Sequence, residues 1–140
     1  MIENVIIFSK EKAAILLATN YDKIIIDSQH FEKSLDAIKQ IAYKLEKGVF
    51  KLELEKELSV LIFAIKRIST ALIFKCSFDK LKLNEWEQVA KDIATGFDKI
   101  YNPTNIKDKK YLEYKEKVDD IINWQLKELS PIEKLKDALW

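Results

Sequence analysis

The stretch VFKLELEKELSVLIFAIKRISTALIFKCSF, residues 49–78, contains three consecutive runs that are typical of β-strands. In the first run, residues 49–55, apolar and charged residues alternate, which predicts a strand with one buried and one wet face. The runs at 58–65 and 71–78 are almost wholly apolar, which indicates strands that are covered on both faces. A turn is predicted between them at residues 67–70. The strand at 49–55 is therefore expected at a sheet edge, with the apolar strands nearer the middle.

Two further strands and a helix are predicted upstream of this stretch. The run at 5–8 is a strand candidate, and the run at 13–18 is its hairpin partner or, as the alternative, a helix capped by Ser9. Residues 24–26 are expected to form a short extended segment. An amphipathic helix is then predicted over residues 29–47, because apolar residues recur at spacings of three and four. They are Phe31, Leu35, Ile38, Ala42 and Leu45.

The rest of the chain predicts helices. One begins near Asn84 and ends before Pro103, since a residue before proline avoids the α region. A second runs from about residue 108 to 129 and carries a broad apolar band, and a short one follows Ser130-Pro131. Residues 1–102 are accordingly assigned to one α/β domain. Residues 103–140 are assigned to a C-terminal helical extension that packs on the domain or on a partner.

This order, β-β-α-β-β-β-α, describes an α+β domain with a five-stranded antiparallel sheet and extra C-terminal helices. Four sequence patterns accompany this predicted order of elements. They are MIENVIIFS at 1–9, LATNYD at 17–22, DSQHF at 27–31, and Phe97 spaced four residues from Tyr101. On these patterns residues 1–102 resemble the longin-like domains of profilin-like fold, including the longin and roadblock-like proteins of Asgard archaea. Roadblock domains begin with a helix, so longin-like is the closer label. Family members usually have a glycine in the first hairpin, where this chain has Ser9-Lys-Glu-Lys12.

The resemblance implies a function as well as a fold. Longin-like domains are not enzymes. They serve in membrane trafficking and as platforms for Ras-like small GTPases, and many form homodimers or heterodimers. The resemblance therefore implies a non-enzymatic protein-interaction module, a scaffold or regulator with a protein partner such as a small GTPase.

Charge and cysteine content narrow the classes of partner. The chain has 24 basic and 23 acidic side chains, so its net charge of +1 gives no general attraction to nucleic acid or anionic lipid. An electrostatic function would need a local patch. The longest nearly uncharged run, residues 58–65, is far shorter than the roughly 20 residues that span a bilayer. A single cysteine, Cys76, suits a reducing compartment, and a cytoplasmic location is expected.

The residues offer little catalytic chemistry. His30 is the only histidine, Cys76 lies in an apolar strand, and Gly48 and Gly96 are too isolated to form a phosphate-binding loop. No catalytic, cofactor-binding or metal-binding residue is assigned, and the chain is not expected to be an enzyme. Two alternatives stay open: a small ligand-binding or enzymatic domain with a pocket between sheet and helices, and a structural subunit of a larger assembly.

The candidate interface lies on the expected edge strand. Lys51, Glu53 and Glu55 form its wet face around Leu52, and two-fold pairing would set Lys51 against Glu53 or Glu55 of a second copy. The alternative interface is Trp124, which helical geometry directs away from the buried side of the last long helix.

Overall fold

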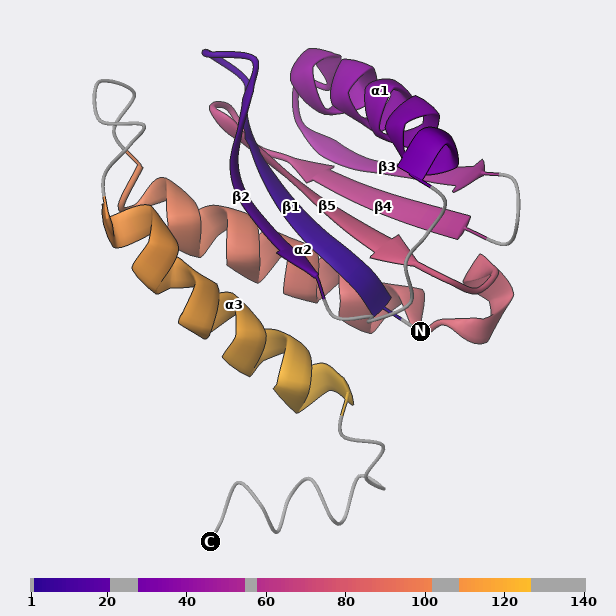
Figure 1. Cartoon of the computed structure of the whole chain (residues 1–140). Coiled ribbons are helices and arrows are strands. Elements are labelled where there is room, and N and C mark those ends of the chain that lie inside the picture. Colours follow the sequence, from indigo (N-terminus) through magenta and orange to yellow (C-terminus); the bar gives the residue numbers. More distant parts are fainter. Residues whose placement is uncertain (1, 21–27, 55–57, 102–108, 127–140) are drawn as a thin grey trace, which may run out of the picture.

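The computed structural model describes residues 2–20, 28–54, 58–101 and 109–126 (Figure 1). Along the chain the elements are β1 (Ile2–Ser9), β2 (Ala14–Asn20), α1 (Ser28–Lys44), β3 (Gly48–Leu54), β4 (Leu58–Ala64), β5 (Ile68–Phe74), a 3₁₀ turn η1 (Phe78–Lys80), α2 (Leu83–Asp98) and α3 (Lys109–Leu126). The fold is α+β, with a five-stranded open sheet in which every pair of neighbours is antiparallel.

The strand order in the sheet is β2-β1-β5-β4-β3. All residues of β1 and β5 are buried, and β4 is nearly so, because these apolar strands lie in the middle with helices on both faces. The alternating strand β3 lies at the edge, as its sequence predicts. The hairpin prediction for the N-terminal region is confirmed, since β2 pairs with β1 and is not a helix.

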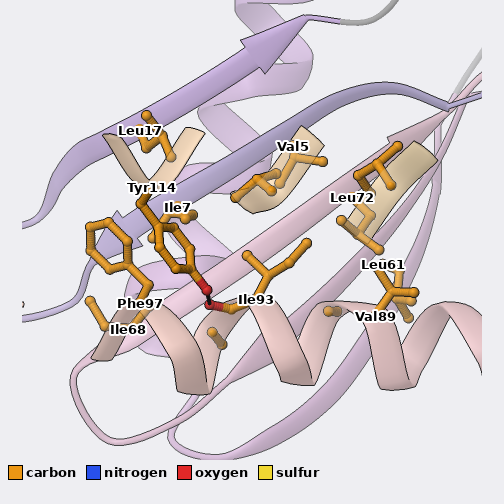
Figure 2. Close-up of a cluster of buried hydrophobic side chains, with 14 of the residues drawn as sticks. Val5, Ile7, Leu17, Leu61, Ile68, Leu72, Val89, Ile93, Phe97 and Tyr114 are labelled. Carbon is orange, nitrogen blue, oxygen red and sulfur yellow. Dashed lines mark hydrogen bonds between the residues drawn. The ribbon is translucent and has the colours of Figure 1, made fainter. Parts of the chain in front are cut away.

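Helices cover both faces of the sheet (Figure 1). On one face, Ile38 and Ala42 of α1 pack on side chains of β1, β4 and β5. On the other face, α2 lies against β4 and β5, and α3 lies against α2 and β2. Figure 2 shows the cluster on this second face, where Phe97 and Ile93 of α2 meet Tyr114 of α3 and the strands above them.

The turn predicted at residues 67–70 is wrong, and β5 begins three residues earlier than residue 71. The turn is shorter and is closed by the Ile65 amide donating to the Ile68 carbonyl at 2.9 Å. Ser69 and Thr70 suggested a turn, but both are buried strand residues. The Ser69 hydroxyl satisfies its hydrogen-bonding need by donating to the Ala42 carbonyl of α1 at 2.6 Å.

The helix predicted over 108–129 corresponds to α3, which packs against α2 and β2. Its buried residues join the cluster of α2 and β2, and they are Tyr111, Tyr114, Val118 and Ile122. The extended segment expected at 24–26 and the short helix after Pro131 fall outside the described residues.

Candidate interaction surface

The outer edge of β3 carries two exposed apolar side chains. Val49 and Phe50 are 38% and 39% exposed, whereas β1 and β5 in the middle are buried throughout. The cause is the position of α1, which packs mainly over β5, β1 and β4. Leu52 and Leu54 contact the apolar cluster beneath α1 and are half-buried, while Phe50 is not covered by α1 and is exposed. This edge therefore combines unpaired backbone groups with apolar side chains.

Register with β4 fixes which face each β3 residue takes. Phe50 and Leu52 pair with Ile62 and Val60, which belong to the cluster on the α1 face. The residues between them, Lys51 and Glu53, consequently point to the α2 face. From Phe50 to Leu54 the strand is amphipathic as its sequence predicts, with apolar side chains towards α1 and charged ones on the other face, where Val49 also lies opposite Phe63.

Lys51 does not simply face solvent. Its ammonium group lies 3.1 Å from a carboxylate oxygen of Glu87 on α2, and both side chains are partly exposed. Glu53 is exposed and has Ser59 as its cross-strand neighbour. Glu55, the fourth residue of the predicted interface, lies outside the described residues. In the described part of β3, this face therefore carries one cation, Lys51, which is held near α2, and one carboxylate, Glu53.

The other edge of the sheet, β2, is less suited to pairing. A register irregularity interrupts its ladder with β1 between Ile7 and Phe8, whereas the β3–β4 register is continuous from Gly48 to Leu54. Bulges twist an edge and hinder the addition of another strand. In addition, α3 packs against β2. Of the two edges, β3 is the regular one, although β2 also carries an exposed apolar side chain, Ile15, which is 37% exposed.

Trp124 lies on a different surface from β3. It is 45% exposed on α3, on the side away from the buried Val118 and Ile122. Because α3 packs on α2 and β2, and β2 is at the opposite end of the strand order from β3, the structure does not bring Trp124 and the β3 edge together. The two interfaces suggested by the sequence are thus separate alternatives.

The described residues also contain a basic pocket that sequence reasoning missed. It has a volume of about 470 Å³ and is lined by Lys10, Glu46, Lys47 and Lys66. These residues come from three separate connections between elements, so no local motif reveals them. The signal that could have found them is topological, since all three connections lie at one end of an antiparallel sheet.

The described side chains first considered for catalysis are not gathered into a site. Among the described residues, no group of three histidine, cysteine or acidic side chains is placed to hold a metal ion. Cys76 is half-buried, and its carbonyl accepts a hydrogen bond from the Ser59 hydroxyl at 2.6 Å. The side chain of His30 lies outside the described set. None of the helices in the described ranges is both long and apolar enough to cross a membrane.

No protein-family model matches the chain, and no curated protein matches it.

Proposed function

We propose that this chain is a non-enzymatic protein-interaction module that pairs with a second copy of itself through the β3 edge. Its resemblance to longin-like domains supports a scaffolding or regulatory role beside a small GTPase or in membrane trafficking. The observation that carries the self-pairing is the arrangement of β3, a regular and accessible edge with exposed Val49 and Phe50.

The sequence of β3 complements itself in one antiparallel register. A two-fold axis through Leu52 and perpendicular to the sheet preserves the two faces, so α1 of each copy lies on the same side. On the α1 face, Phe50 then lies opposite Leu54 of the second copy, and on the other face Lys51 lies opposite Glu53. Cross-strand apolar and opposite-charge pairs each contribute about 0.2–1 kcal/mol. The symmetry forms every such pair twice.

Neighbouring registers are less favourable for the described residues. An axis through Lys51 sets two lysines against each other, and an axis through Glu53 does the same for two glutamates. Like charges directly opposite one another destabilise a strand pair. The register through Glu53 is also the one that would bring Lys51 opposite Glu55. The charges of β3 therefore favour the register centred on Leu52.

The test is a set of charge exchanges followed by light scattering on the full chain. The wild type at about 100 µM should have the mass of a dimer, since an interface of about 6 kcal/mol would be substantially occupied at that concentration. Lys51→Glu should give a monomer, because its new carboxylate faces the carboxylate of Glu53 in the second copy. The double variant Lys51→Glu/Glu53→Lys restores opposite charges in the proposed register and should restore the dimer.

A second double variant separates the intermolecular effect from the intramolecular one. Lys51→Glu/Glu87→Lys keeps an opposite-charge pair between β3 and α2, but the carboxylate introduced on β3 still faces Glu53 of the second copy. It should stay monomeric with a circular dichroism spectrum like that of the wild type. A monomeric wild type, or a dimer that persists in Lys51→Glu, would refute self-pairing through this register.

A further inference from the structure

Three connections between elements meet at one end of the sheet. β1 ends at Ser9 opposite Ile68, where β5 begins, and β4 ends at Ala64 opposite Gly48, where β3 begins. The β1–β2 turn, the α1–β3 connection and the β4–β5 turn are consequently neighbours. Each of the three contributes a lysine, and these are Lys10, Lys47 and Lys66.

The three lysines and Glu46 line a pocket of about 470 Å³. The formal charge of the lining is +2, although the whole chain of 140 residues carries only +1. The fold thus gathers, in an open hollow at the end of the sheet, positive charge that the composition does not reveal.

Lys10 is a fixed element of this pocket. Its ammonium group donates to the carbonyl of Glu46 at 2.6 Å and to the carbonyl of Ile65 at 3.0 Å. Its backbone amide donates to the Arg67 carbonyl at 2.9 Å. Lys10 therefore ties the α1–β3 connection to the β4–β5 turn and places a charge between them.

The electrostatic surroundings of Lys10 favour an added anion. Burial lowers the pKa of Lys10 from its usual 10.5; the nearby Glu46 carboxylate raises it, and the charge of Lys47 lowers it by a smaller amount. Desolvation is therefore the cost of holding the ammonium group charged in this place. A bound anion would offset this cost.

Lys47 and Lys66 differ from the neighbouring Arg67 in their partners. The Arg67 guanidinium pairs with the Asp98 carboxylate at 2.9 Å, and its carbon lies 5.4 Å from the centre of the Tyr101 ring. Lys47 and Lys66 are exposed, and neither makes an ion pair with any residue that the structure describes. The charge of Arg67 is thus neutralised within the fold, whereas the two lysines retain donors for a ligand.

We propose that this pocket binds the phosphate group of a phosphorylated small molecule or lipid headgroup. A phosphate monoester carries up to two negative charges and presents several acceptor oxygens, and lysines bind it as point charges from different directions. Lys10 supplies the anchored charge, and Lys47 and Lys66 supply the exposed ones. This site is independent of the β3 self-pairing and adds a ligand to the proposed interaction module.

The experiment is a titration of the isotopically labelled full chain with inorganic phosphate at constant ionic strength, followed by amide chemical shifts. Saturable shifts are expected around residues 10, 46–47 and 65–67. Lys47→Gln/Lys66→Gln should weaken binding by about tenfold or more, since hydrogen bonds to charged groups contribute about 1.5–3 kcal/mol each. Both lysines are exposed, so the variant should keep the wild-type circular dichroism spectrum.

The matched control is Lys75→Gln/Lys82→Gln, which removes the same charge at the other end of the sheet. Lys75 follows β5 and Lys82 precedes α2, about 20 Å from the pocket by the length of a seven-residue strand. The control should bind phosphate like the wild type. Equal loss in both variants, or shifts that spread over the surface without saturating, would overturn the proposed site.

Sedimentation with vesicles identifies the source of the phosphate. Phosphatidylcholine vesicles with and without phosphatidylinositol 4-phosphate are compared for the wild type and for both double variants. Binding that needs the phosphorylated lipid and is lost only in Lys47→Gln/Lys66→Gln assigns the site to a headgroup. Saturable phosphate binding without vesicle binding assigns it to a soluble phosphorylated molecule.

Discussion

The hydroxyl of Tyr114 on α3 occupies the space into which a side chain on Gly96 of α2 would project. From there it donates a hydrogen bond to the carbonyl of Ile93 at 2.9 Å (Figure 2). A glycine inside a helix costs about 1 kcal/mol relative to alanine. Here its missing Cβ lets a buried tyrosine from the next helix satisfy its hydroxyl, so this glycine determines how closely α3 can dock.

Gly96→Ala should have opposite effects in two backgrounds. In the wild type it should lower the free energy of unfolding by about 1–3 kcal/mol, because Tyr114 must move from its acceptor. In Tyr114→Phe the hydroxyl is gone and the next atom of the ring is 3.4 Å from the new Cβ, so alanine should stabilise by about 0.5–1 kcal/mol. Urea unfolding of the four proteins measures this cycle. Equal effects in both backgrounds would contradict the packing of Tyr114 against Gly96.

Stability should decline at alkaline pH through Tyr114. Burial, aided by the negative charge of Asp92, raises the pKa of Tyr114 to about 12 from an ordinary value of 10.0. The folded state therefore holds this proton more tightly than the unfolded state. The stabilisation is fully present below pH 10 and is lost as the pH rises from 10 towards 12, by at most about 2–3 kcal/mol. Chemical unfolding at a series of pH values measures the loss.

The control for this pH dependence is Tyr114→Phe, which cannot ionise at that position. Its stability should fall less steeply above pH 10, and the remaining slope should include Tyr43, whose pKa is also raised by burial. An unchanged slope in Tyr114→Phe would show that Tyr114 ionises like an exposed tyrosine.

Ser69 and Thr70 are adjacent buried hydroxyls with opposite expected effects on stability. Ser69→Ala removes the 2.6 Å hydrogen bond to the Ala42 carbonyl, which then lacks this donor. The substitution should lower the free energy of unfolding by about 1 kcal/mol. The Thr70 hydroxyl has no hydrogen-bond partner among the described residues. Thr70→Val keeps the shape of the side chain and removes the buried hydroxyl, so it should raise the free energy of unfolding by up to about 1 kcal/mol. Thermal melts compare the two variants, and destabilisation by Thr70→Val would indicate an acceptor for its hydroxyl.

Ser69 and Thr70 also show where the sequence alone was insufficient to predict the fold. A serine and a threonine after Arg67 resemble turn residues, and the sequence does not show that Ser69 pairs with Phe8 and Ala64 and donates to the Ala42 carbonyl. By contrast, the edge position of β3 followed from its alternating pattern alone, because a strand covered on both faces cannot carry charges at every second residue.

The candidate sites differed in the same way. The exposed Trp124 and the wet face of β3 were predictable because each depends on the periodicity of one element. The ion pair of Lys51 with Glu87 was not, since the sequence does not say which helix lies beside which strand. The pocket of Lys10, Lys47 and Lys66 requires the order of the strands in the sheet, which local patterns do not contain.

Trp124→Ala distinguishes the two routes of association. If copies pair through β3, this substitution should leave the mass in solution unchanged, because Trp124 lies on α3 and α3 packs near the opposite edge of the sheet. It should also change the free energy of unfolding by less than about 1 kcal/mol, since the side chain is nearly half exposed. Ile122→Ala on the buried side of the same helix is the matched comparison and should cost about 2–5 kcal/mol. Light scattering and urea unfolding of both variants give the answer, and a monomeric but stably folded Trp124→Ala would move the interface from β3 to α3.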